Sequence, residues 1–222
     1  CGKSTVSNLL MGFWDADSGR IEINGKDIKN YSQENISNLI GSVGQEVILF
    51  DLSIFDNIAI GKLNATKEEV IEASKKARCH DFISALPNGY ETRVGEMGVK
   101  LSGGEKQRIS IARMILKNAP ILILDEAMAA VDSENERLIG EAIDDLSMDK
   151  TIITIAHHLN TIRDSDQIIV MDKGVVLDAG SHEELMKRCE FYKDMVEAQN
   201  KVDRWNLKDD SLSRARNGVD CE

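Results

Sequence analysis

The sequence has no long hydrophobic run and no clustered cysteines. The longest apolar run, at residues 119–124, is far shorter than the roughly 18 residues that a membrane-spanning helix needs. The four cysteines are widely separated and form no C-x-x-C pair, a pattern that favours free thiols in a reducing compartment over a disulfide framework or a zinc site. The adjacent Cys79 and His80 lack nearby partners in sequence, so we expect them to pack in the core.

Positive charge is also scarce. Lysine and arginine number 27 against 38 acidic residues, which gives a formal net charge of -11. Such an acidic chain lacks the electrostatic footprint of a duplex nucleic-acid binder. With 222 residues, 42% of them hydrophobic and 29% charged, it can bury a large core, which excludes a disordered chain, a collagen and a disulfide-stabilised miniature fold.

The first residues of the sequence do not resemble a leader. The chain opens with Cys1 rather than methionine, and its first residues resemble neither a signal peptide nor a transit peptide. We therefore expect a fragment whose beginning lies upstream.

Short apolar segments alternate with helical patterns along the chain. Residues 20–24 alternate polar and apolar side chains, which predicts a half-exposed strand. Runs of branched apolar residues predict strands buried on both faces at residues 121–124, 151–155 and 167–171. Strands that alternate with helices predict an α/β fold with a mostly parallel sheet, in which ligands bind at the carboxyl ends of the strands.

The middle of the chain, at about residues 46–117, shows mainly helical patterns. Thr66 and Ser102, each with a glutamate three residues later, match the capping box that begins many helices. We therefore expect a helical subdomain within a sheet domain at residues 1–198. Residues 199–222 are polar and predict a tail.

The first residues match part of a phosphate site. Gly2, Lys3, Ser4 and Thr5 open directly into an apolar-periodic helix, and phosphate sites use backbone N–H groups at a helix start, a lysine and a hydroxyl for Mg²⁺. Taken alone, this segment is equally consistent with a capped helix that has a lysine in its first turn.

Two carboxylates follow a buried strand. Asp125 and Glu126 come directly after four apolar residues, and an unpaired buried charge costs several kcal/mol, on the order of 3–5. The pair therefore suggests a cation or proton transfer, with Asp125 on the metal side and Glu126 as the base for an attacking water. A solvated strand end is the alternative.

A second anion site is indicated at Ser102, Gly103 and Gly104. Glycines at a helix start cost about 1 kcal/mol each relative to alanine, unless something must approach the backbone closely. The chain would then hold two half-sites for phosphate, each completed by the other subunit of a pair.

Residues 101–108, Leu-Ser-Gly-Gly-Glu-Lys-Gln-Arg, resemble the signature motif of ATP-binding-cassette (ABC) ATPases. Other motifs of the family match in the same order: the end of Walker A at residues 2–5, the Q-loop at Gln45, the end of Walker B at residues 125–126, the D-loop at residues 129–132 and the switch histidine at His157. Residues 92–96 resemble a segment of exporter-type members. The resemblance covers nearly the whole chain and implies a P-loop NTPase core with a helical, signature-bearing subdomain.

The resemblance implies ATP and Mg²⁺ as ligands. Lys3 would bind the β- and γ-phosphates, and Thr5 would lie near the α-phosphate. The residues implied in nucleotide binding are Gly2, Lys3, Ser4, Thr5, Gln45, Ser102, Gly103, Gly104 and Asp132. The residues implied in metal binding are Ser4, Gln45 and Asp125.

For hydrolysis, the resemblance implies three catalytic residues. Glu126 would orient and deprotonate the attacking water, His157 would contact the γ-phosphate, and Gln45 would sense the γ-phosphate or water. The segment at residues 102–104 would close over ATP bound to a second nucleotide-binding domain, identical or not, with Asp132 bridging the two.

The function implied is that of the ATPase module of an exporter-type transporter. Its transmembrane domain would precede Cys1 on the same chain, which implies a location at the cytoplasmic face of the membrane. The apolar residues 47–50 would form part of the patch that receives a coupling helix, or would pack in the core.

A soluble ABC-type ATPase of DNA repair or translation is the alternative. Repair members insert a long coiled coil between Walker A and the signature, and no heptad pattern separates Lys3 from Ser102. Translation members have two cassettes and basic linkers, whereas this chain has one cassette and a net charge of -11. We therefore expect no nucleic-acid partner.

Overall fold

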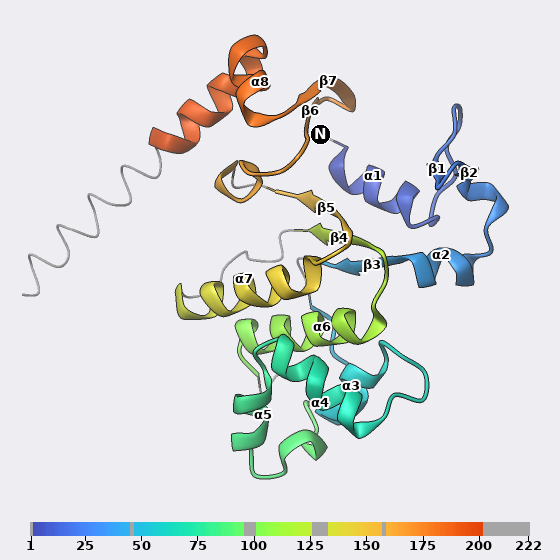
Figure 1. The fold of residues 1–222 in the computed structure, drawn as a ribbon, viewed down its shortest axis with the longest axis vertical. Helices are drawn as coiled ribbons and strands as arrows, with labels where there is room; N and C mark the ends of the chain where they lie inside the picture. The colour runs from blue at the N-terminus through green and yellow to red at the C-terminus, as the bar shows by residue number, and fades with distance from the viewer. Residues whose placement is uncertain (1, 45–46, 96–100, 126–132, 157–158, 202–222) are drawn as a thin grey trace, which may run out of the picture. The chain divides into compact units, whose positions relative to one another are not determined.

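The computed structural model describes residues 2–44, 47–95, 101–125, 133–156 and 159–201 (Figure 1). The chain divides into two compact units. The larger unit is Ser4–Ile155, and the smaller unit consists of Cys1–Lys3 together with Ala156–Glu222.

A parallel three-stranded sheet in the order β3-β4-β5 organises the larger unit. Its strands are β3 (Ile40–Val43), β4 (Ile121–Asp125) and β5 (Thr151–Ile155). The central strand β4 buries three successive apolar side chains, as predicted. The prediction of burial on both faces is wrong for β5, which buries only Ile155 fully. Among the described strands β5 pairs on one side only, with β4, which explains its exposure.

Helices form the part of the larger unit between the first two strands of this sheet. The elements are α3 (Ile54–Ala59), α4 (Lys67–Lys76), α5 (His80–Ala85), η2 (Gly89–Glu91) and α6 (Gly103–Lys117). The capping boxes predicted at Thr66 and Ser102 are both present. The next helix, α7 (Ser133–Ser147), packs beside α6 on one face of the sheet (Figure 1).

The core of this region lies between α6 and its neighbours. Ile109, Ile111 and Ala112 of α6 are fully buried and belong to one cluster with Ile58 of α3 and Ile139 of α7. The fifteen-residue α6 is therefore the helix around which the others pack.

A short hairpin precedes the sheet. After α1 (Lys3–Leu10), strands β1 (Glu22–Ile23) and β2 (Lys26–Asp27) pair antiparallel. Asn24 and Gly25 between them both have positive φ, the conformation of a two-residue hairpin turn. The predicted strand at 20–24 is thus confirmed in type and is shorter than expected. The elements η1 (Ile28–Asn30) and α2 (Gln33–Leu39) lead into β3.

The smaller unit contains an antiparallel hairpin rather than another parallel strand. Strands β6 (Ile168–Asp172) and β7 (Val175–Gly180) pair with each other, after the short helix η4 (Leu159–Ile162). Their buried face packs on α8 (His182–Arg188). Burial therefore alternates along β6, and the expectation of burial on both faces is wrong there as well. Hydrogen bonds from Arg188 hold the pKa of the Asp178 carboxyl below its usual range.

Across the part of the chain that the structure describes, the helices are too short or too polar to cross a lipid bilayer.

Gly61 packs closely on the backbone of α6, and this packing predicts different effects of two glycine-to-alanine substitutions. A Cβ at Gly61 would lie 2.2 Å from the carbonyl oxygen of Arg113, whereas a Cβ at Gly140 on α7 would meet nothing within 4 Å. We expect Gly61→Ala to lower the free energy of unfolding by about 1–3 kcal/mol, because backbone must move to admit the methyl group. Gly140→Ala is the matched control, and we expect it to raise stability by roughly 0.5–1 kcal/mol through helix propensity. Urea unfolding of both variants measures the difference, and equal effects would contradict the packing described.

Candidate functional site

Lys3, the predicted phosphate-binding lysine, lies beside the chain segment that leads into the predicted switch histidine. Its Nζ donates a hydrogen bond of 3.2 Å to the carbonyl oxygen of Ala156, the residue immediately before His157. Both partners belong to the smaller unit. A hydrogen bond from a side chain to the main chain thus joins the first motif of the family, at residues 2–5, to the segment just before the last motif, at His157.

The residues around Lys3 fit an anion-binding helix start. Gly2 has a φ of 98°, a left-handed conformation that glycine adopts without strain. The helix α1 begins at Lys3, so the backbone N–H groups of its first turn have no intrahelical acceptors. Ser4 and Thr5 are exposed in this first turn. Exposed N–H groups, hydroxyls and a lysine are the donors that a phosphate needs.

Asp125 ends the central strand of the sheet. Leu122, Ile123 and Leu124 are buried in front of it, and Asp125 itself is half-buried. It pairs in register with Ile155, the last residue of β5. A carboxylate at the carboxyl edge of a parallel sheet has the position at which such sheets bind ligands.

Ser102 caps the amino end of α6 through a reciprocal pair of hydrogen bonds. Its Oγ accepts from the Glu105 N–H at 3.3 Å, and a Glu105 carboxylate oxygen accepts from the Ser102 N–H at 2.8 Å. Ser102 and Gly103 are exposed, and a Cβ at Gly103 would meet nothing within 4 Å. The start of α6 is therefore open to an approaching group.

At position 104 a glycine is needed for packing, which is not so at position 103. A Cβ at Gly104 would lie 2.4 Å from Cγ of Asn135 on α7. Close packing of α7 on α6 therefore already requires a glycine there. The close approach that the sequence predicted at this helix start is therefore made at Gly104 by α7, while the predicted anion site stays a prediction.

Several predicted site residues lie outside the described residues. These are Gln45, Glu126, Asp132 and His157. Ser4, Asp125 and residues 102–104 lie on three separate elements of the larger unit.

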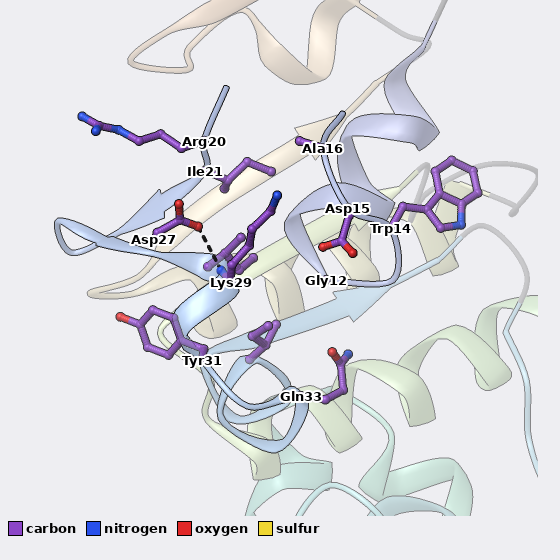
Figure 2. A pocket seen from close by; sticks show the side chains of 12 residues that line it. Gly12, Trp14, Asp15, Ala16, Arg20, Ile21, Asp27, Lys29, Tyr31 and Gln33 are labelled. Carbon is purple, nitrogen blue, oxygen red and sulfur yellow. Dashed lines mark hydrogen bonds between the residues drawn. The ribbon is translucent and has the colours of Figure 1, made fainter. Parts of the chain in front are cut away.

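A cavity of about 320 Å³ lies elsewhere in the larger unit, and none of the predicted site residues lines it (Figure 2). Trp14 and Tyr31 line it together with charges of both signs, among them Asp15, Asp27 and Lys29. The Asp27 carboxylate accepts the Lys29 N–H at 3.0 Å, where it caps η1. Because its charges are mixed, this cavity offers no concentrated cationic surface for a triphosphate.

The apolar residues 47–50 divide between the core and the surface. Leu49 is 2% exposed, whereas Ile48 and Phe50 are 61% and 52% exposed, and Leu52 nearby is 41% exposed. We call Ile48, Phe50 and Leu52 together the Phe50 surface. Core packing is therefore confirmed for Leu49, whereas contact of the exposed Ile48 and Phe50 with a coupling helix stays a prediction.

Sequence reasoning overlooked two polar residues behind this surface, the buried Asn57 and the half-buried Arg113. Asn57 of α3 and Arg113 of α6 bond to the loop that carries Phe50. The signal in the sequence that could have revealed them is a polar residue at an inward-facing position of an otherwise apolar helix pattern.

The expected core packing of the Cys79-His80 pair is confirmed for Cys79, which is buried, whereas His80 is half-buried. Its thiol donates to the Ser74 carbonyl at 3.3 Å, and burial raises its pKa to about 12. His80 bonds through Nδ1 to the Tyr90 hydroxyl at 2.9 Å. Among the described residues, no group of three metal-binding side chains is present.

Burial predicts that Cys79 is inert in the folded protein. With a pKa of about 12, only about one thiol in 10⁴ is ionised at pH 8, and thiolates are the reactive form. We expect no labelling of Cys79 by a maleimide or an aromatic disulfide until the protein is unfolded in guanidinium. Peptide mass spectrometry identifies the labelled cysteine. Rapid labelling of native Cys79 would show that the thiol is accessible.

Comparison with known proteins shows the family. The family model described as "ABC transporter" matches residues 1–129. Over 199 residues the chain is 52% identical to "Putative multidrug export ATP-binding/permease protein YgaD" of Bacillus subtilis (strain 168), which covers 90% of this chain and 34% of that protein. A protein of the same description from Staphylococcus aureus (strain N315) is 50% identical with the same coverage.

A solved structure agrees. "Structure of a bacterial Atm1-family ABC exporter with ATP bound" matches with a TM-score of 0.84 and 46% identity, over 89% of this chain and 35% of that chain.

The chain belongs to the ABC transporter family. It is the ATPase domain of that family, with the predicted α/β P-loop NTPase fold, and it spans about a third of the length of the relatives it matches. These relatives are export proteins, so the alternative of a DNA-repair or translation ATPase is not favoured.

Proposed function

We propose that the chain is the nucleotide-binding domain of an exporter-type transporter and couples ATP binding and hydrolysis to substrate movement across a membrane. The open amino end of α6 is the observation that carries this proposal. Ser102 and Gly103 are exposed there, in a chain 52% identical to an export protein that joins ATP-binding and permease parts. In this proposal the domain spans residues 1–198, with the helical subdomain at about residues 46–117 and the tail at 199–222.

The first part of the proposal is the grip on ATP. Lys3 binds the β- and γ-phosphates, while the Gly2 and first-turn N–H groups of α1 and the Thr5 hydroxyl bind the phosphate oxygens. Gln45 and Asp132 complete the nucleotide contacts of the chain. The exposure of Ser4 and Thr5 in the first turn of α1 supports this assignment, because helix starts are common phosphate sites.

The residues proposed for Mg²⁺ offer hard oxygen ligands. The Ser4 hydroxyl is exposed and the Asp125 carboxylate is half-buried, and Mg²⁺ prefers such oxygens together with those of phosphate. Gln45 contributes its amide oxygen. When bound, Mg²⁺ neutralises charge on the transferring phosphate.

The chemical step needs positioned groups more than covalent chemistry. Glu126 orients the attacking water and accepts its proton, His157 contacts the γ-phosphate, and Gln45 reports the presence of that phosphate. The Lys3 contact to Ala156 supports this arrangement, because it ties the phosphate lysine to the main chain just before His157.

The fourth part is a head-to-tail pair of such domains. Ser102, Gly103 and Gly104 of one domain close over the ATP held by the other, and Asp132 bridges the interface. The open position at Gly103 supports this role, since a bound phosphate could approach the N–H groups there without steric conflict.

The remaining partner is a transmembrane domain on the same polypeptide. The relatives are ATP-binding/permease proteins, and this chain covers 34% of their length. The Phe50 surface is the proposed contact, because three large apolar side chains stand exposed on one loop. In this proposal the domain lies at the cytoplasmic face of a membrane and has no nucleic-acid partner.

The proposed base predicts a specific defect. In the full-length protein, we expect Glu126→Gln to retain ATP binding, to lower turnover by about 10²–10⁴-fold through loss of the general base, and to trap a closed pair of domains. Phosphate release, nucleotide retention and cross-linking across the pair measure these three effects. Normal turnover of this variant would refute the assignment.

The proposed docking surface predicts a second defect. We expect Phe50→Glu in the full-length protein to weaken ATP-driven transport by about tenfold or more, because a charge would enter an apolar contact. Met148→Glu is the matched control, since Met148 is also apolar and 71% exposed but lies after α7. Dye transport and ATP turnover in proteoliposomes distinguish the two variants. Equal behaviour would remove the Phe50 surface from the proposal.

A further inference from the structure

Asn57 is a buried amide with every hydrogen-bonding position used. Its side chain is 0% exposed. The Nδ2 group donates to the carbonyl oxygens of Phe50 and Ser53, both at 3.0 Å. The Oδ1 atom accepts from the Phe50 N–H at 2.9 Å and from the Arg113 guanidinium at 3.3 Å. An amide has two donors and two acceptor positions, so none remains unsatisfied.

These bonds hold the backbone of the Phe50 surface in one place. Asn57 engages both the N–H and the C=O of Phe50, as a neighbouring strand would. A second attachment comes from residues 92–94, where the Val94 N–H donates to the Leu52 carbonyl at 3.1 Å and the Ile54 N–H to the Thr92 carbonyl at 3.0 Å. The loop before α3 is therefore exposed in its side chains and fixed in its main chain.

Arg113 connects this loop to α6. Its Nε donates to the Asn57 carbonyl at 2.9 Å, and a terminal nitrogen donates to the Ile48 carbonyl at 3.3 Å. The Asn57 carbonyl lies in the last turn of α3, where carbonyls lack an intrahelical donor and where a positive charge is favourable. One guanidinium thus reaches α3 and both ends of the Ile48–Phe50 stretch, through Ile48 directly and through Asn57 at Phe50.

The contact between α6 at Arg113 and the segment that follows α3 is closely packed. The backbone of α6 at Arg113 comes so close to Gly61 that a Cβ there would lie 2.2 Å from the Arg113 carbonyl oxygen. The Arg113 guanidinium donates to the main-chain carbonyl oxygens of Asn57 and Ile48 and to the Asn57 amide oxygen. Figure 1 shows α3 lying against α6, the helix that begins at the open signature end.

We propose that Arg113 and Asn57 are the positioning residues through which movement of α6, driven by nucleotide at its amino end, reaches the Phe50 surface. This inference rests on the proposed function, in which that surface meets the transmembrane domain. Neither residue touches nucleotide. They act by making α6 and the loop that carries the Phe50 surface move together.

The test uses the full-length protein in lipid nanodiscs, with ATP and vanadate as the probe. Hydrogen–deuterium exchange mass spectrometry follows peptides of α6 and of the transmembrane part, and phosphate release follows turnover. For Arg113→Met we expect the ATP-dependent change in α6 to remain and turnover to stay within about twofold. The ATP-dependent change in the transmembrane part should fall by about fivefold or more, the usual scale of a lost coupling between sites.

Lys117→Met supplies the matched control. Lys117 also lies on α6 and donates to a main-chain carbonyl, that of Ile40 at 3.0 Å, and burial lowers the pKa of both Lys117 and Arg113. Its partner belongs to β3 rather than to the Phe50 loop, so we expect this variant to keep the transmembrane response. If Arg113→Met does not fold, Arg113→Lys provides the same comparison, since a lysine lacks the fork that reaches two carbonyls.

The outcomes separate the inference from the proposed function. A full transmembrane response in Arg113→Met or Arg113→Lys would overturn the inference and leave the proposed function intact. An equal loss in Lys117→Met would reduce Arg113 to general stabilisation of α6 and would also overturn it. If ATP alters α6 but nothing in the transmembrane part of the wild-type protein, the proposed coupling function fails and the inference fails with it.

Discussion

Three cationic side chains along α6 bond to neutral oxygens on three different elements, and the arrangement of the larger unit depends on these bonds. Arg108 donates to Asn135 on α7 and lies over the Phe82 ring at 5.3 Å. Arg113 bonds to α3 and its preceding loop, and Lys117 to the end of α2 and start of β3 at Ile40. Partly buried charges need such partners, because an unsatisfied one costs far more than a hydrogen bond returns. The helix can therefore neither rotate nor slide without breaking several of these bonds.

Each element attached to α6 adjoins a segment with a proposed role. The strand β3 leads toward Gln45, α7 follows residues 126–132, and the Phe50 surface precedes α3. Close packing of Gly61 on the Arg113 backbone and of Gly104 on the Asn135 side chain strengthens these attachments, since densely packed interiors resist displacement. A displacement that began at Ser102 would consequently be shared with all three neighbours. This makes α6 the structural link between the proposed nucleotide half-site and the rest of the domain.

The sequence predicted those features whose causes are local. The capping boxes at Thr66 and Ser102, the strand β4 and the helix α4 depend on neighbouring residues, and each was found. The strand β3 was not predicted, because Ile-Gly-Ser-Val is too short and too poor in apolar residues to show a period. The exposure of β5 could not be predicted, since it depends on which strands pair beside it. At the site, motif spacing supplied the residue types, whereas the contact of Gly104 with α7 and the bonds of Arg113 depend on tertiary packing alone.

Arg113 bonds to neutral oxygens rather than to a carboxylate. This explains why the sequence pattern does not reveal its role and why the contact is suited to transmit movement. An arginine paired with a carboxylate leaves a signal of opposite charges, and both side chains can change rotamer to keep their bond while the backbones separate. Main-chain carbonyls at Ile48 and Asn57 leave no such signal in the sequence. Main-chain carbonyls also cannot change rotamer. The bond therefore survives a displacement of α6 only if the backbone that carries the Phe50 surface follows. The planar guanidinium fork reaches two backbone positions at once, so in the proposed coupling both positions follow α6 together.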